Sequence, residues 1–324
     1  MANPPRSAPT LRMNTQAMAC EFAVVLNQFA HEHADAASFA FERVHALEEC
    51  MTVYREDAEL VRVNQSSGPV EVSEDLARVV AKVRELFDVT DGYFDPTTGP
   101  LIQLWRDCRT EQRVPSDDEV TAALARIGGQ HVHVEENTIT REQDVQINLG
   151  AIGKGFALDE AGKELKARGA NDWLIHGGRS SILASGDHNN QGGWPVGIGN
   201  PVFTNERLGV FVLKDEALGT SGSNIQYFRH GGKRYGHILN PKTGWPADQV
   251  ASVTVLAPTA AEADALSTAF FAAGVEFARE WCDNRPEIRV ILVPFPTTGR
   301  IIEPVLVNIP ADRISWSSDQ VRLP

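Results

Sequence analysis

Two oxygen-bearing side chains, Asp264 and Thr268, stand four residues apart in the segment Ala263-Asp-Ala-Leu-Ser-Thr268. Residues with this spacing share one face of a helix. Their neighbours are mostly apolar, and a carboxylate is costly to bury among apolar groups without a partner. A carboxylate and a hydroxyl are hard ligands that suit Mg²⁺, with water and substrate phosphates completing its shell. The same pattern also fits a local Asp–Thr hydrogen bond, or an aspartate on an exposed strip of the helix.

A glycine-rich turn, Gly150-Ala-Ile-Gly-Lys-Gly155, is the second candidate. It follows Val145–Leu149, whose apolar pattern predicts a strand, and it precedes an expected helix that ends near Gly169. Unpaired N–H groups at a helix start, together with Lys154, are suited to a pyrophosphate. The spacing matches neither the P-loop nor the GxGxxG pattern. The alternative is a tight strand-to-helix connection that binds nothing.

Two loops add aromatic and basic groups. His237 begins the segment His237–Pro246, where Asn-Pro, Thr-Gly and Trp-Pro pairs indicate an ordered loop. This histidine is either a general base or a structural hydrogen-bonding group. The segment Tyr93–Trp105 is rich in turns yet apolar and aromatic. Such a loop can clamp a planar ring, or it can simply close one edge of the core.

The elements that would position these groups alternate irregularly between helices and strands, which predicts the α+β class. Apolar spacing and capping residues predict helices over Asp35–Met51, after Ser73, after the capping box of Ser116 and Glu119, and from the Thr259 and Glu262 box to Gly274. Strands are expected at 21–26, 173–176, 181–185, 195–199, 209–214, 253–256 and 287–293. Residues 1–12 are predicted to form a disordered arm, and residues 13–324 a single catalytic domain.

Composition excludes several functions. The chain has 324 residues, 42% of them hydrophobic, and a net charge of −13, which disfavours nucleic acid as a partner. Any anionic ligand must therefore be held by local groups. Cys20, Cys50, Cys108 and Cys282 form no CxxC pair, so a zinc site is not expected. No apolar run is long enough for a membrane span, and the N-terminal segment lacks a signal-peptide centre, which favours a cytoplasmic location.

These motifs, in this order, resemble the ApbE family of FAD:protein FMN transferases. The resemblance runs from about Met13 to Gly274. It is carried by Met18-Ala-Cys-Glu-Phe, Tyr54-Arg-Glu-Asp-Ala-Glu-Leu-Val-Arg-Val-Asn64, Phe94-Asp-Pro-Thr-Thr-Gly-Pro-Leu, Asn148-Leu-Gly-Ala-Ile-Gly-Lys-Gly, Gly177-Gly178, Thr220-Ser-Gly, His237-Ile-Leu-Asn-Pro-Lys-Thr-Gly-Trp-Pro and Ala263-Asp-Ala-Leu-Ser-Thr.

The resemblance implies an ApbE-like fold, with mixed or antiparallel sheets flanked by helices and a cofactor site between two lobes. It implies Mg²⁺-dependent transfer of FMN from FAD to a Thr or Ser hydroxyl of an acceptor flavoprotein, with release of AMP. Alternatives are an FAD pyrophosphatase that releases FMN and AMP, or a non-catalytic FAD-binding protein. The implied FAD contacts are Met18, Tyr54, Tyr93, Phe94, Asp95, Asn148, Lys154 and Ile238. The implied Mg²⁺ ligands are Asp264, Thr268 and the Ala151 carbonyl, and His237 is the candidate catalytic residue, as proton acceptor.

The chain also departs from the family pattern. Asn148 and Asn240 stand where the family usually has aspartate, and Ser223-Asn-Ile stands where Asp-Tyr is common. The loss of two carboxylates bears on how the adenine or the metal would be held.

Overall fold

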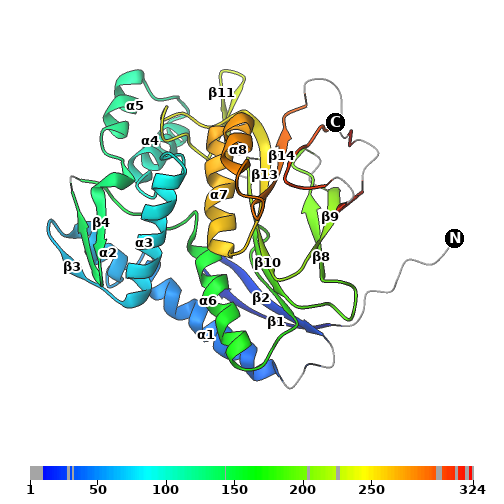
Figure 1. Ribbon diagram of the computed structural model, residues 1–324. Helices are drawn as coiled ribbons and strands as arrows, with labels where there is room; N and C mark the ends of the chain where they lie inside the picture. Colours follow the sequence, from blue (N-terminus) through cyan, green and yellow to red (C-terminus); the bar gives the residue numbers. More distant parts are fainter. Residues whose placement is uncertain are drawn as a thin grey trace.

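An eight-stranded sheet is the centre of the structure, and every pairing within it is antiparallel (Figure 1). The computed structural model describes residues 10–27, 30, 33–142, 144–202, 205–223, 227–296, 301–310, 313–317 and 321–322. With its flanking helices, the sheet confirms the predicted α+β class. Its strands, in spatial order, are β1 (Thr10–Ala17), β2 (Cys20–Asn27), β6 (Trp173–Gly177), β7 (Ser181–Ser185), β10 (Glu216–Gly222), β13 (Val250–Ala257), β14 (Arg289–Pro294) and β15 (Val305–Val307).

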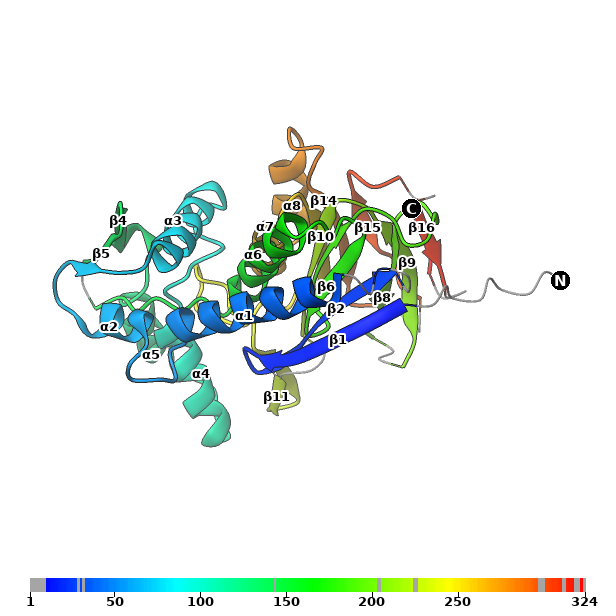
Figure 2. The same ribbon diagram turned by 90° about the horizontal axis from the view of Figure 1, so that it is seen from below.

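Helices cover one face of this sheet and a second, smaller sheet covers the other (Figure 2). The alternation of side chains along β10 shows both faces, because Ala217 joins the core under the helices and Leu218 joins the core under the smaller sheet. The covering helices are α1 (Ala34–Met51), α6 (Gly153–Ala167), α7 (Ala260–Ala273) and α8 (Val275–Cys282). The smaller sheet has the order β16 (Ile314–Trp316), β9 (Arg207–Leu213), β8 (Trp194–Gly199).

A second lobe of short elements lies beside the large sheet, at the left of both views (Figures 1 and 2). Ser73 and Ser116 cap two of its helices as predicted, and the full capping box with Glu119 is present. The lobe comprises α2 (Glu59–Gln65), α3 (Glu74–Val89), α4 (Gly99–Thr110), α5 (Asp117–Leu124), a 3₁₀ turn (Gly129–His131) and a sheet of β3 (Val70–Glu71), β5 (Thr138–Arg141) and β4 (Val132–Glu135). Across the described ranges, no helix combines the length and apolar character needed to cross a membrane.

The predicted strand at Val145–Leu149 is wrong. Its apolar side chains are buried at alternate positions, as in a strand, but no strand in the described residues pairs with it. The Asn64 side chain takes that role instead, since its amide nitrogen donates to the Ile147 carbonyl and its oxygen accepts from the Ile147 N–H, both at 2.8 Å. Side-chain amides can satisfy a backbone in this way without forming a ladder.

Two predicted boundaries also need adjustment. Strand β1 begins at Thr10, so residues 10–12 belong to the sheet rather than to a disordered arm. Residues 1–9 lie outside the described part of the chain. At α7, Thr259 caps the helix by accepting from the Glu262 N–H, whereas the Glu262 carboxylate bonds the Thr259 hydroxyl, so the predicted box is only half formed.

Two glycines allow α7 to lie unusually close to its neighbours. A Cβ atom at Gly155 of α6 would stand 2.1 Å from the Ala260 carbonyl oxygen. One at Gly219 of β10 would stand 2.4 Å from the Ala263 carbonyl carbon. Backbone atoms cannot move aside as a flexible side chain can, so both positions require glycine. The last glycine of the Gly150–Gly155 motif therefore has a packing role.

The segment His237–Pro246 is an ordered loop, as predicted, and Asn240 fastens it to α7. The Asn240 side chain donates to the Ala272 carbonyl at 3.0 Å and accepts from the Lys242 N–H at 2.8 Å. The loop follows a hairpin of β11 (Tyr227–His230) and β12 (Lys233–Gly236). An aspartate could make the second of these bonds but not the first.

We predict that Gly155→Ala destabilises the fold by about 1–3 kcal/mol or more, because the added methyl group meets backbone. Urea unfolding would measure the change. Gly68→Ala is the matched control, since a Cβ at Gly68 meets nothing within 4 Å. Equal stability of the two variants would contradict the close approach of α6 and α7.

We predict that Asn240→Asp costs about 1–3 kcal/mol, because it leaves the Ala272 carbonyl without its donor and places negative charge at the last turn of α7. The control is Asn148→Asp, because the Asn148 side chain only accepts, from the Gly150 N–H at 2.8 Å. That variant should stay within about 0.5 kcal/mol of the wild type. A chemical denaturation series at neutral pH would compare them, and a harmless Asn240→Asp would refute the tether.

Candidate functional site

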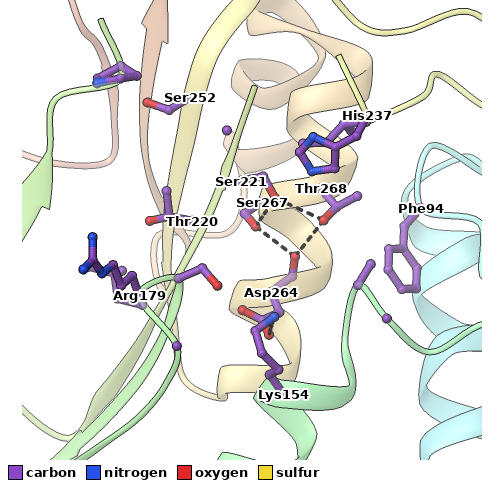
Figure 3. Close-up of a pocket in the computed structure, with 18 of the residues that line it drawn as sticks. Phe94, Lys154, Arg179, Thr220, Ser221, His237, Ser252, Asp264, Ser267 and Thr268 are labelled. Carbon is purple, nitrogen blue, oxygen red and sulfur yellow. Dashed lines mark hydrogen bonds and ion pairs between the residues drawn. The ribbon is translucent and has the colours of Figure 1, made fainter. Parts of the chain in front are cut away.

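A cavity of about 1070 Å³ lies at one end of the eight-stranded sheet, where several strands begin or end. The start of β2, the turn between β6 and β7, the end of β10 and the start of β13 all meet there. The 93–98 segment of the second lobe closes one side. The cavity thus lies between the two lobes, as the family resemblance predicted. Figure 3 shows the side chains that line it.

Asp264 is a buried acid of the cavity, with only 5% of its surface exposed. Its Oδ2 accepts hydrogen bonds from the Gly155 N–H and the Ser181 hydroxyl, both at 2.9 Å, and Lys154 Nζ lies 3.8 Å away. Burial raises the pKa of Asp264, and Lys154 and the two hydrogen bonds oppose that rise only in part. Oδ1 accepts no hydrogen bond from any described residue, so half of the carboxylate remains available to a ligand.

Thr268 lies one helical turn after Asp264 and also lines the cavity. Its hydroxyl donates to the Asp264 backbone carbonyl at 3.2 Å and lies 3.1 Å from Ser221 Oγ. Ser267 makes a parallel pair of contacts, at 2.9 Å each (Figure 3). The local hydrogen bond considered from the sequence therefore exists, but it uses the backbone of Asp264 and leaves the carboxylate free of Thr268.

The Gly150–Gly155 turn offers fewer N–H groups to a phosphate than its sequence suggests. The N–H groups of Gly150, Ile152 and Gly153 bond within the turn, and that of Gly155 bonds Asp264. In a continuous helix the Gly155 N–H would instead bond the Ala151 carbonyl. That carbonyl accepts no hydrogen bond from the described residues and lines the cavity. The turn therefore presents a free carbonyl and the Lys154 ammonium group beside Asp264.

The aromatic segment both closes the core and lines the cavity. Phe94 is 3% exposed, and Tyr93 packs against Phe277 with ring centroids 4.8 Å apart. Asp95 lines the cavity, but its Oδ1 is held by the Thr97 N–H at 2.7 Å and the Thr97 hydroxyl at 2.6 Å. Burial raises the pKa of Asp95 despite these bonds. Trp105 lies outside the lining and donates to the Gly244 carbonyl at 2.8 Å.

His237 and Ile238 line the cavity from the loop that follows β12, and Asn148 lines it from the segment before α6. The His237 side chain is exposed, and Figure 3 places its ring close to Thr268. Ten of the predicted site residues therefore line this cavity: Tyr93, Phe94, Asp95, Asn148, Ala151, Lys154, His237, Ile238, Asp264 and Thr268.

Two predicted FAD contacts lie elsewhere. Met18 sits in the tight turn between β1 and β2 with a φ of 50°, its N–H bonded to Glu48 and its side chain packed on the core. Tyr54 is 86% exposed, and neither residue lines the cavity. Conversely, Ser181 and Arg179 were missed, because a Gly-Gly-Arg-Ser-Ser hairpin turn carries no chemical signature of its own.

The oxygen donors at the Asp264 end suit a hard cation. Within the described ranges, no three His, Cys, Asp or Glu side chains are grouped closely enough to hold a metal ion. A cation here would therefore have one carboxylate, supplemented by the Thr268 hydroxyl and the Ala151 carbonyl. This sparse set fits Mg²⁺, which usually keeps water and substrate phosphates in its shell.

Comparison with known proteins agrees with these features. A model described as the ApbE family matches residues 18–292. The FAD:protein FMN transferase of Haemophilus influenzae is 34% identical over 244 residues, covering 71% of this chain and 70% of that protein. That of Escherichia coli K12 is 32% identical over 250 residues, covering 74% and 71%.

Solved structures give the same result. The ApbE protein of Thermotoga maritima superposes with a TM-score of 0.79 at 28% identity, covering 88% of this chain and 94% of that one. Flavin transferase ApbE from Vibrio cholerae gives 0.77 at 28% identity, with 92% and 98% covered. The resemblance predicted from the motifs is confirmed: this chain belongs to the ApbE family.

Proposed function

We propose that this protein transfers FMN from FAD to a Thr or Ser hydroxyl of an acceptor flavoprotein, in a Mg²⁺-dependent reaction that releases AMP. The curated relatives named above carry the name FAD:protein FMN transferase. The observation that carries the proposal is the free Asp264 Oδ1 beside the free Ala151 carbonyl and the Thr268 hydroxyl. These hard oxygens lie in a cavity that also offers aromatic rings and cations.

The reaction is a phosphoryl transfer. The acceptor oxygen forms a bond to the FMN-side phosphorus, the bond from that phosphorus to the bridging oxygen breaks, and AMP leaves with that oxygen. The hydroxyl proton passes to a base. Such reactions demand mainly positioning and charge neutralisation from a protein.

The residues present fit a magnesium ion. Asp264, Thr268 and the Ala151 carbonyl would hold it, and Ser181 and Gly155 would keep the carboxylate oriented through their hydrogen bonds. When bound, the ion would neutralise the negative charge of the pyrophosphate oxygens.

The remaining lining residues divide the other tasks. Lys154 stands beside Asp264 and can bind a pyrophosphate oxygen. Tyr93, half-buried at the cavity, presents ring surface that suits a planar heterocycle, and the buried Phe94 packs behind this segment. His237 is exposed, lines the cavity and lies near Thr268, so we assign it the role of accepting the hydroxyl proton (Figure 3).

Product analysis tests the function. The purified protein is incubated with FAD, Mg²⁺ and candidate acceptor flavoproteins, followed by in-gel flavin fluorescence and measurement of AMP. Covalent FMN on a protein with an equal amount of AMP supports the transferase. Free FMN with AMP would instead establish an FAD pyrophosphatase, and intact FAD a non-catalytic binder.

We predict that Asp264→Asn lowers turnover at least about a hundredfold, the scale of one lost transition-state electrostatic contact. It should also erase the Mg²⁺-dependent rise in melting temperature in the presence of FAD, because a ligand stabilises only the state that binds it. Burial raises the pKa of Asp264 in the folded state. At pH values above the unfolded pKa, the ionised carboxylate therefore lowers the stability of the fold. The metal-free Asn variant should therefore melt no lower than the wild type at neutral pH.

Asp159→Asn is the control for this measurement. Asp159 is a half-buried neighbour on α6 whose pKa burial raises to about 6, and its carboxylate accepts from the Ala260 and Ala261 N–H groups at 2.8 and 2.9 Å. It does not line the cavity. This variant should keep the Mg²⁺ shift even if its melting temperature falls. A normal Mg²⁺ shift in Asp264→Asn would remove Asp264 from the metal site.

A further inference from the structure

The cavity extends over both faces of the sheet end. On β10, Ser221 faces α7 and contacts Ser267 and Thr268, whereas the next side chain, Thr220, faces the other way and contacts Thr254 at 3.0 Å. Figure 3 shows Arg179, Thr220 and Ser252 on the side of β10 away from Asp264. We call this part the β8 chamber, and its lining comprises Arg179, Ile182, Leu218, Thr220, Ser252 and residues 197–201.

None of the residues assigned above to FAD or Mg²⁺ lies in the β8 chamber. Tyr93, Phe94 and Asn148 approach the cavity from the second lobe, and Lys154, Asp264 and Thr268 belong to α6 and α7. The proposed ligands thus occupy the helical side of the sheet end. These assignments leave the chamber on the opposite side without a ligand.

Two polar groups in the chamber have no partner among the described residues. Arg179, exposed at the turn between β6 and β7, makes no hydrogen bond, ion pair or ring contact with them, and the Ser252 hydroxyl makes no hydrogen bond. Ile182, Leu218 and Ile198 supply apolar wall around these groups. In a chain of net charge −13, an uncommitted arginine in a cavity favours a ligand that carries an acidic group.

The chamber also has an open strand edge. In the order β16-β9-β8, one edge of β8 has no partner strand in the described part of the chain. Gly197 and Gly199 lie on this strand, line the cavity and carry no side chain to obstruct an approaching backbone. An open edge of this kind accepts an extended segment of another chain through main-chain hydrogen bonds.

We propose, resting on the transferase function, that the β8 chamber binds the acceptor protein. A segment of the acceptor in extended conformation pairs with the open edge of β8, and an acidic side chain near the modified residue binds Arg179. Attack on phosphorus comes from the side opposite the leaving AMP. The acceptor hydroxyl then arrives from the chamber across the sheet end, while FAD lies on the helical side.

The test uses Arg179→Glu, with the flavoprotein that the wild-type enzyme labels as the probe. The variant should raise the KM for that acceptor at least about tenfold, because like charges now oppose each other. It should leave kcat, the affinity for FAD and the melting temperature unchanged. Arg229→Glu on β11, which makes the same charge change outside the cavity lining, should change none of these values. Arg179→Lys should restore part of the affinity.

A second variant addresses the strand edge independently of charge. A Cβ at Gly199 meets nothing within 4 Å, so Gly199→Leu should fold normally while its side chain fills the part of the cavity beside the β8 edge. It should raise the acceptor KM in the same way. An unchanged KM in both variants would overturn the inference, and so would a tenfold loss of FAD affinity, which would give the chamber to the adenylate half of FAD. If the wild type labels no protein, the proposed function fails first, and this inference falls with it.

Discussion

The buried carboxylate of Asp264 is the constraint around which the site is built. A carboxylate that is 5% exposed must have partners, or the fold would favour its neutral form. The partners come from three places: the Gly155 N–H at the start of α6, the Ser181 hydroxyl at the start of β7, and Lys154. None of these contacts can form until α6, α7 and the sheet have packed together. The geometry of the site therefore depends on the packing of the core.

Close packing and the polar site depend on the same two glycines. Gly155 lets α6 approach the first turn of α7, and its own N–H then reaches Asp264. Gly219 lets β10 approach the same turn from the sheet, which brings Ser221 of β10 within reach of Ser267 and Thr268. A side chain at either position would move α7 away and break the hydrogen bonds as well as the apolar contacts. A change that moves α6 or β10 away from α7 would therefore lower stability and disturb the site at the same time.

The sequence predicted those features whose cause is local. Helix ends followed from Ser73, Ser116 and Thr259, and the shared face of Asp264 and Thr268 followed from helical spacing. Features with a distant cause were missed. The 145–149 segment lacks a strand because Asn64 supplies its hydrogen bonds, and the Gly155 N–H is unavailable to phosphate because Asp264, 109 positions away in the chain, takes it. No window of sequence contains both partners of such bonds.

The two asparagines that replace the family's usual aspartates have different consequences. At position 240 the amide makes a bond to the Ala272 carbonyl that a carboxylate cannot make, so asparagine there strengthens the attachment of the His237 loop to α7. At position 148 the side chain only accepts, and aspartate would serve equally well for the turn. Its effect is electrostatic: the acids lining the cavity are then Asp95 and Asp264, and Lys154 lies beside Asp264. Burial also raises the pKa of Asp95 and Asp264, because it disfavours the ionised form of each carboxyl group. An acidic protein thereby retains a cavity that does not repel a pyrophosphate, through the carboxylate replaced at position 148 rather than through added basic residues.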